Sequence, residues 1–308
     1  MSDFPSSLWN NDRFEIPENL TDSLWAVLEE NGLLEMAQLD KIPKVSGGAS
    51  KCDTEEYLAK LGAVSCVRPM SVLLDPRGCH LSPRQLLREC THQGKIALID
   101  FPSGCGTTTL GLLSTVEQMR RERHWIAFDL EISVLALDIS PYALQHFESL
   151  LSKCKRKLNQ QLIQLNLKTQ VLDVADKERV SIVINDWVAS VEKDVDYILV
   201  LASSFSGYAS KSSSNRDSVA DSFDFIKRRL HTEREQSRFL VWMETGSDSA
   251  KEFLKRLAKV LVFNSPINES RYKFTNPFQR KERACNLQSG CIEIARPTRE
   301  YGTANNDE

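Results

Sequence analysis

The sequence predicts an α/β fold in which helices cover both faces of a doubly wound, mostly parallel sheet, preceded by a small helical extension. Short apolar runs alternate with amphipathic helical segments along most of the chain, and this alternation implies parallel strands joined by helical crossovers. Several of the apolar runs end in an acidic residue, and the first of them passes directly into a glycine turn. The hydrophobic fraction of 41% and the charged fraction of 26% are ordinary for a globular protein.

Residues 1–81 are expected to form the helical extension, which is a candidate for recognising a substrate or a protein partner. Apolar residues recur at helical spacing between residues 20 and 34, where Gly32 can interrupt or end the helix. Residues 46–50 read Ser-Gly-Gly-Ala-Ser and predict a flexible break.

A helix with Ser82 as its cap is expected to lead into a strand at 96–99, which is buried on both faces and is followed by Asp100. The strand passes into a short turn that is followed by a run of threonines able to start a helix. A strand, a tight glycine turn and a helix N-terminus form the usual cradle for a nucleotide-like ligand. The turn consists of Pro102, Ser103, Gly104, Cys105 and Gly106.

The alternation continues to residue 296, and the resulting sheet is expected to have seven strands. Residues 203–218 contain eight serines and predict a long loop, either a lid or a solvated insertion. Residues 297–308 predict a disordered tail. The other expected elements are helices over 108–123, from Pro141 onward, around 219–231 and over 250–261, and strands over 134–137, 181–184, 196–201, 238–243, near 260–263 and over 291–295.

A net charge of −3 excludes a global basic field, so a nucleic-acid partner would need a local patch. Basic runs are usually solvated helix faces, but two of them on one side of a cleft would form an RNA-binding rim. Runs of this kind occur at 120–124, 153–157, 227–229 and 280–283.

The sequence favours a cytoplasmic protein that does not enter a membrane. No apolar stretch reaches the ~18–20 residues of a membrane span, and the first residues lack the basic and apolar regions of a signal peptide. The eight cysteines are therefore expected to be free thiols. Their spacing to histidines matches no common zinc site, and no metal is expected.

Acidic residues follow four of the predicted strands. They are Asp100, Asp138, Asp186 and Glu244. In dinucleotide-binding folds the acid after the second strand accepts hydrogen bonds from ribose hydroxyls, and Asp138 is well placed for this role.

These segments resemble the class I S-adenosylmethionine-dependent methyltransferases over roughly residues 82–296. The stretch from Asp100 to Gly106 resembles the first motif of that family, and 137–144 looks like the segment after its second strand. Residues 184–187 are similar to the third motif, whose acid lies at the adenine, although Asp173 is an alternative candidate for that acid. Residues 196–204 look like the fourth strand of the family, and residues 239–247 resemble its fifth strand and the turn that follows.

The resemblance implies methyl transfer from S-adenosylmethionine. The acceptor can hardly be read from the sequence, and RNA is a weak first choice ahead of protein or a small molecule. It places the 102–106 turn and Asp100 against the methionine part of the cofactor. The ribose would lie at Asp138, followed by Ile139. The remaining implied contacts are Asp186 and Trp187 at the adenine, Ala202 at the cofactor, and Ser203 and Ser204, as weak catalytic candidates, at the transferable methyl group.

The chain departs from the family pattern at two places. Pro102 stands where the family has its first glycine, and proline removes an N–H and fixes φ. After the fourth strand, Ala202-Ser-Ser-Phe205 lacks the Asn/Asp-Pro-Pro-aromatic signature of amino-methyltransferases and any nucleophilic cysteine. DNA amino-methylation and cytosine-C5 chemistry are therefore not expected.

Two other interpretations stay open. A degenerate phosphate-binding loop would need G-x-x-x-x-G-K-[ST], but here Phe101 takes the first glycine position and Thr107 the lysine position. A catalytically silent methyltransferase-like subunit of a complex would also account for Pro102 and the serine-rich loop.

Overall fold

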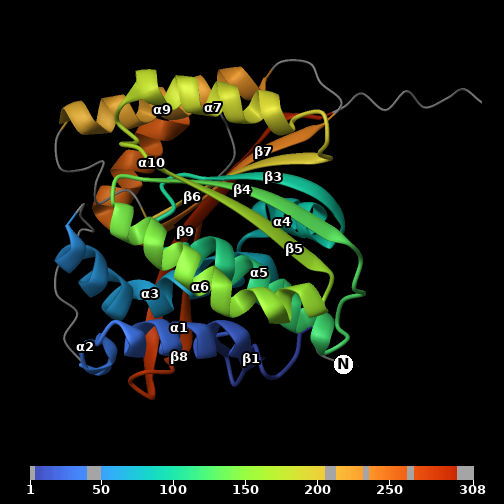
Figure 1. Ribbon diagram of the computed structural model, residues 1–308, viewed down its shortest axis with the longest axis vertical. Helices are drawn as coiled ribbons and strands as arrows, with labels where there is room; N and C mark the ends of the chain where they lie inside the picture. The colour runs from blue at the N-terminus through green and yellow to red at the C-terminus, as the bar shows by residue number, and fades with distance from the viewer. Residues whose placement is uncertain (1–3, 40–49, 205–212, 232–235, 262–266, 297–308) are drawn as a thin grey trace, which may run out of the picture.

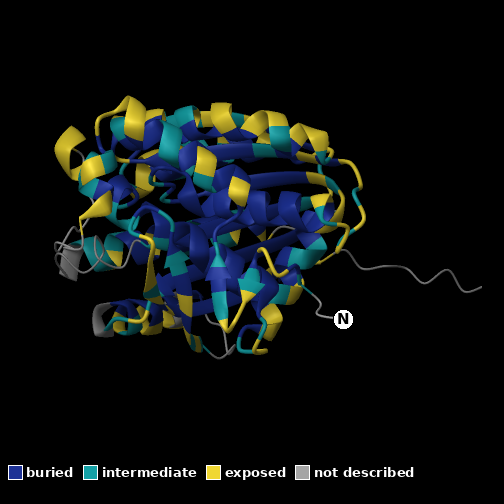
Figure 2. Ribbon diagram, turned by 90° about the horizontal axis from the view of Figure 1, so that it is seen from below, coloured by how far each residue is buried: buried dark blue, intermediate teal, exposed yellow. Residues whose placement is uncertain are grey.

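The computed structural model describes residues 4–39, 50–204, 213–231, 236–261 and 267–296 and arranges them in three layers (Figure 1). A twisted sheet lies between two layers of helices, and the sheet is the most deeply buried part of the molecule (Figure 2). The expected tail at 297–308 and most of the expected break at 46–50 lie outside the described residues.

The sheet has nine strands in the order β1-β2-β8-β9-β7-β6-β3-β4-β5, not the expected seven. Its orientation is mixed, because β9 is antiparallel to both neighbours and β1 is antiparallel to β2. The expected count fell short because the N-terminal segment adds β1 and β2 at one edge, where β2 pairs with β8. The strands are β1 Trp9–Asn10, β2 Arg13–Glu15, β3 Gly94–Asp100, β4 Leu130–Asp138, β5 Ile163–Val171, β6 Tyr197–Ser203, β7 Ser237–Thr245, β8 Asn268–Asn276 and β9 Lys281–Ala295.

Helices cover both faces of the sheet, as expected. Side chains of β3 alternate between the two cores, so that Ile96 and Leu98 face α3, α5 and α6, whereas Ala97 and Ile99 face α7, α9 and α10. The helices are α1 Glu18–Glu30, α2 Leu34–Gln38, α3 Lys51–Leu74, α4 Leu81–His92, α5 Thr107–Arg121, α6 Pro141–Gln160, α7 Lys177–Val191, α9 Ser213–Leu230 and α10 Asp248–Leu261.

The parallel part of the sheet reverses its direction of winding between β3 and β6. From β3 the chain adds β4 and β5 on one side, and it then returns to add β6 and β7 on the other. Ligands of open α/β sheets bind at the carboxyl ends of the strands beside such a switch point. Asp100 is paired with Leu201 across it, so the site is expected at the ends of β3 and β6.

The N-terminal extension packs into the same core as the rest of the chain. Leu24, Val27 and Leu28 of α1 are fully buried in the core that α5 and α6 share, and α1 ends before Gly32, which has φ +68°. Helix α3 lies close against α5, because a Cβ at Gly111 would approach the carbonyl oxygen of Cys66 to 2.7 Å.

Among the described residues, α3 is the one helix with the length and apolarity to cross a membrane. Within its most apolar window, 78% is buried inside the protein. This burial is typical of a core helix.

The strand expected at 181–184 is wrong, because these residues lie within α7. Val180, Ile184 and Val188 are buried at four-residue spacing, which is a helical pattern, and the side chain of Asp176 caps the helix by accepting a hydrogen bond from the Arg179 N–H.

The third parallel strand is β5, for which no strand was expected. It lies at the edge of the sheet, and its amino half alternates buried Ile163 and Leu165 with exposed polar residues. The strand expected near 260–263 is also wrong, because α10 continues to Leu261, and β8 takes its place further along the chain.

Two helix starts differ from expectation. Helix α4 begins at Leu81 with His80 at its N-cap, so Ser82 lies inside the helix. Helix α9 begins at Ser213, within the expected serine-rich loop. The part of that loop at 205–212 lies outside the described residues.

Candidate functional site

The glycine turn after β3 is bonded to the end of β4 through Asp138. The Gly104 N–H donates to Asp138 Oδ2 at 2.8 Å, and the Ser140 N–H donates to Asp138 Oδ1 at 2.8 Å. The Ser103 N–H donates to the Leu137 carbonyl at 2.9 Å. The sequence prediction that Asp138 lies beside the turn therefore agrees with the geometry.

Asp100 places a second carboxylate beneath the same turn. It is fully buried, and its Oδ2 accepts a hydrogen bond of 2.6 Å from the Thr109 hydroxyl of α5. Its Oδ1 is buried without a hydrogen-bond partner. Burial raises the pKa of Asp100 well above its ordinary value, and the nearby charge of Asp138 raises it further. The hydrogen bond from Thr109 acts in the opposite direction and lowers the pKa. Burial also raises the pKa of Asp138, although the backbone N–H groups of Ser140, Gly104 and Ile139 oppose it.

The two glycines of the turn have different surroundings. A Cβ at Gly106, which has φ +72°, would lie 2.1 Å from the ring of Phe147. A Cβ at Gly104, which has φ +53°, would meet nothing within 4 Å, so the backbone faces open space there. Helix α5 begins directly after Gly106, and no side chain caps its N-terminus. The turn thus opens onto space beside the uncapped first N–H groups of α5, as a cradle for a ligand requires.

The other two members of the turn have less scope for chemistry. Pro102 is half-buried and follows a cis peptide bond. Cys105 is buried, and burial raises the pKa of its thiol, so the thiol is not a reactive nucleophile.

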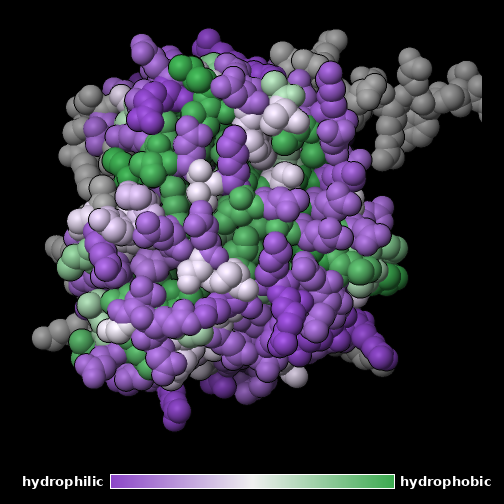
Figure 3. Space-filling view, in the orientation of Figure 1, coloured by the Kyte–Doolittle hydropathy of each residue, from purple (hydrophilic) through white to green (hydrophobic). Residues whose placement is uncertain are grey.

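Apolar side chains are exposed beside Asp138. Ile139 is 37% exposed and Val171 is 46% exposed, and Val171 is paired with Asp138 across β4 and β5. The face of the molecule shown in Figure 3 is mainly hydrophilic, with apolar surface gathered between the two helical layers. Exposed apolar side chains next to a buried carboxylate can form an apolar surface on which a planar ring packs.

The acid that follows the third parallel strand is Asp173. The Leu172 N–H donates to the Asp138 carbonyl at 2.9 Å, which brings the end of β5 beside Asp138. The Asp173 side chain accepts a hydrogen bond of 2.8 Å from the Ala175 N–H.

Asp186 and Trp187 do not follow a strand. Both lie inside α7, where Asp186 is exposed and Trp187 is buried in the core beneath the helix. The expectation that they lie at the adenine required a strand at 181–184. That strand is wrong, because these residues belong to α7.

Ala202, Ser203 and Ser204 stand at the end of β6, next to the switch point. Ala202 is buried on the side of α7 and α9. The Ser203 and Ser204 hydroxyls lie 3.2 Å apart, and Ser204 has φ +61°. The guanidinium of Arg68, on α3, donates to the Ser204 hydroxyl. Sequence reasoning missed Arg68, because no motif surrounds it and its partner lies 136 residues away.

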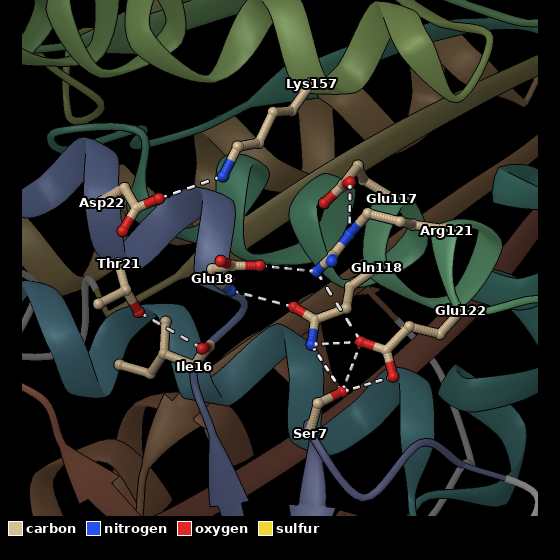
Figure 4. Close-up of polar contacts among 10 residues, drawn as sticks. All are labelled: Ser7, Ile16, Glu18, Thr21, Asp22, Glu117, Gln118, Arg121, Glu122 and Lys157. Carbon is tan, nitrogen blue, oxygen red and sulfur yellow. Dashed lines mark hydrogen bonds and ion pairs between the residues drawn. The ribbon is translucent and has the colours of Figure 1, made fainter.

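Two of the basic runs contact the N-terminal segment. Arg121 of α5 pairs with Glu18 of α1, and next to it the Gln118 side chain bonds both Ser7 and the Glu18 N–H (Figure 4). Arg120 is buried and donates to backbone carbonyls. The run on α6 forms the ion pairs Lys153–Glu30 and Lys157–Asp22 with α1.

The site fits the cofactor that the resemblance implies. Asp138 accepts hydrogen bonds from backbone N–H groups through both carboxylate oxygens, and a carboxylate has about four acceptor positions, more than these N–H groups use. Asp100 contributes a buried oxygen without a partner, and Gly104 opens onto space.

Across the part of the chain that the structure describes, no group of three or more His, Cys, Asp and Glu side chains could hold a metal ion.

No protein-family model matches the chain. No curated protein matches it either.

Solved structures similar to the chain include S-adenosylmethionine-dependent methyltransferases. An O-methyltransferase from Thermotoga maritima that depends on this cofactor is 14% identical over 69% of this chain, with a TM-score of 0.34. A second such methyltransferase, from Agrobacterium tumefaciens, is 11% identical over 68% of this chain, with a TM-score of 0.33. The chain spans 64% and 59% of these two proteins.

An rRNA methyltransferase from Streptomyces viridochromogenes is 11% identical over 70% of this chain and 85% of its own, with a TM-score of 0.31. Because all three TM-scores are low, the function of the chain is inferred from its own site.

Proposed function

We propose that this chain is an S-adenosylmethionine-dependent methyltransferase. The observation that carries the proposal is the contact between Asp138 and the Gly104 N–H, which joins a strand-end carboxylate to an open glycine turn. In this proposal Asp138 accepts hydrogen bonds from the ribose hydroxyls. Ile139 and Val171 pack on the faces of the adenine, and Asp173 replaces Asp186 as the acid beside it.

The charges around the turn favour this cofactor over a nucleoside triphosphate. Asp100 and Asp138 flank the turn with two carboxyl groups, and the position of a phosphate-binding lysine is held by Thr107, which is buried. Like charges at close range repel in a low-dielectric site, so a polyphosphate is disfavoured there. A cationic sulfonium ligand gains from the same carboxylates.

The chemistry that the cofactor supplies when bound is a methyl group on a positively charged sulfur. The protein then has to align an acceptor nucleophile with that group, which alone can contribute much of the rate. Ser203 and Ser204 stand at the end of β6, where the resemblance puts the methyl group. The described hydrogen bonds of their hydroxyl groups are to each other and to Arg68, so we assign them to positioning and not to proton removal. RNA is the acceptor to test first, then protein and small molecules.

Calorimetry with S-adenosylmethionine, S-adenosylhomocysteine and Mg-ATP tests the proposal. The first two ligands should bind the wild-type protein, and Asp138→Ala should abolish that binding. Glu131→Gln is the matched control, because Glu131 is a half-exposed carboxylate at the opposite end of β4, where it pairs with Lys95. Magnesium-dependent binding of ATP, with no response to the other two ligands, would overturn the proposal.

A labelled-methyl assay on total RNA, total protein and small-molecule extracts then separates an enzyme from a silent subunit. Incorporation that Asp138→Ala abolishes supports the enzyme. Stoichiometric cofactor binding without incorporation into any fraction would favour the binding subunit instead.

A further inference from the structure

Arg68 is a buried cation for which the described residues provide no counter-ion. Its residue is 3% exposed, and Nη1 donates to the hydroxyl groups of Ser204 and, at 3.4 Å, Ser65. Its Nε is buried with no hydrogen-bond partner. Within the described part of the chain no carboxylate forms an ion pair with Arg68. A buried guanidinium without a counter-ion is unfavourable, so its retention points to an anionic group that the described residues do not supply.

Arg68 and Asp100 lie on the same face of the sheet at the switch point. Ile96 and Leu98 of β3, and Leu199 and Leu201 of β6, face the core beneath α3 and α5. By strand alternation Asp100 and Ser203 face that side as well. Ser203 contacts Ser204, to which Arg68 donates. The carboxylate of Asp100 and the guanidinium of Arg68 therefore lie on the same side of the sheet, at the ends of two neighbouring strands.

The carboxyl group of Asp100 and the guanidinium of Arg68 are not paired with each other. Arg68 and Asp100 form no ion pair, and each retains a buried polar atom without a hydrogen-bond partner: Nε of Arg68 and Oδ1 of Asp100. A ligand that satisfies both atoms needs a hydrogen-bond donor for Asp100 and an acceptor for Arg68, and an anionic acceptor would also neutralise the guanidinium. An α-amino acid has this arrangement.

We propose that Arg68 binds the carboxylate at the amino-acid end of the cofactor, while the free oxygen of Asp100 accepts a hydrogen bond from its ammonium group. This inference rests on the proposed function. The planar guanidinium matches a carboxylate in geometry as well as charge. Because Arg68 is buried, a small end group of a bound cofactor reaches it more readily than an acceptor entering from solvent. Helix α3 of the N-terminal extension thereby becomes part of the cofactor site.

The test compares S-adenosylmethionine with decarboxylated S-adenosylmethionine, since the two ligands differ only in the carboxylate. Wild-type protein should prefer the carboxylated ligand by roughly 10- to 100-fold in Kd, measured by calorimetry, as for one charge-assisted hydrogen-bonding contact. Arg68→Met should remove this preference by weakening only the carboxylated ligand. Arg68→Lys keeps the charge without the planar fork and should retain part of the preference. Arg156→Met, an exposed position on α6, should retain all of it.

Thermal denaturation without ligand separates binding from structure. Removing an unpaired buried charge should leave the Tm of Arg68→Met unchanged or higher. The inference fails if Arg68→Met keeps the wild-type preference, or if it weakens both ligands equally. If Arg68→Met does not fold, full preference in Arg68→Lys overturns the inference and reduced preference supports it. A wild-type protein that binds neither ligand would refute the proposed function itself.

Discussion

The backbone N–H of Gly104 donates to Asp138 Oδ2 across 2.8 Å, and this bond joins the turn after β3 to the end of β4. The two segments lie 34 residues apart in the chain. Because a second N–H, from Ser140, binds the other carboxylate oxygen, the side chain is held in one orientation. The site is therefore largely formed before any ligand arrives, which reduces the entropy lost on binding.

Alanine at the two glycines of the turn should have unequal effects on stability. Gly104→Ala should cost about 1–2 kcal/mol, because only the left-handed backbone is strained. Gly106→Ala should have the same cost in folding free energy and a further cost of about 1–3 kcal/mol from overpacking, because the new Cβ would overlap the ring of Phe147. Urea denaturation of the two variants measures the difference. Equal losses would show that Phe147 moves aside freely.

Asp100→Asn should stabilise the ligand-free protein at neutral pH. The folded pKa of Asp100 is raised above the unfolded value of 3.8 by burial. The folded state therefore holds its proton to higher pH than the unfolded chain, and stability declines as the pH rises through the folded pKa. An asparagine keeps an acceptor for Thr109 and carries no such penalty. The Tm advantage of the variant should increase as the pH is raised from about 4 toward the folded pKa of Asp100. A constant advantage would mean that Asp100 does not titrate over this range.

His80 should make the fold sensitive to mild acid. Its Nδ1 and Nε2 lie 2.7 Å and 2.6 Å from the hydroxyls of Ser289 and Ser270, and burial lowers its pKa below 6.5, against the charge of Asp75. The unfolded chain binds the proton more readily, so stability is lost as the pH falls below about 6.5. The drop in Tm between about pH 7.5 and about pH 5.5 should be smaller in His80→Gln than in the wild type. A drop of the same size in both proteins would remove His80 as the cause.

The N-terminal helix should be held by its apolar face and not by its ion pairs. Leu24→Ala should cost about 2–5 kcal/mol, because the side chain is fully buried. Lys157→Ala should cost less than about 1 kcal/mol, because its partner Asp22 is 65% exposed. Chemical denaturation of the two variants tests the contrast, and a larger loss for Lys157→Ala would contradict it.

Short sequence patterns were sufficient to predict the central strands and helix starts of the fold. The apolar runs that became β3 and β4, the glycine turn between β3 and α5, and the Ser140 cap with Pro141 at the start of α6 each lie within a few residues of chain. Strand-terminal acids beside a glycine turn then placed Asp138 next to Gly104, because parallel strands end at the same edge of the sheet.

The errors arose where packing decides the structure. No individual helix was expected over 51–74, where α3 lies, because α3 is buried on almost every side over 62–74 and lacks the polar stripe that identifies a helix in sequence. Edge strand β5 carries polar residues that resemble a loop. Arg68 could not be recognised as a site residue, because its importance depends on burial and on a hydroxyl group from a distant strand.

The final prediction separates two acids that the sequence alone could not. Asp173 follows β5 beside Asp138, whereas Asp186 is exposed on α7. Asp173→Asn should weaken S-adenosylhomocysteine binding by roughly 10-fold, as expected for the loss of one hydrogen bond to a charged group. Asp186→Asn should leave the Kd unchanged. Calorimetry on both variants decides between them, with the Tm of each showing that the fold is intact. A loss confined to Asp186→Asn would mean that the adenine lies against α7, and the assignment of Ile139 and Val171 as its flanking residues would fall with it.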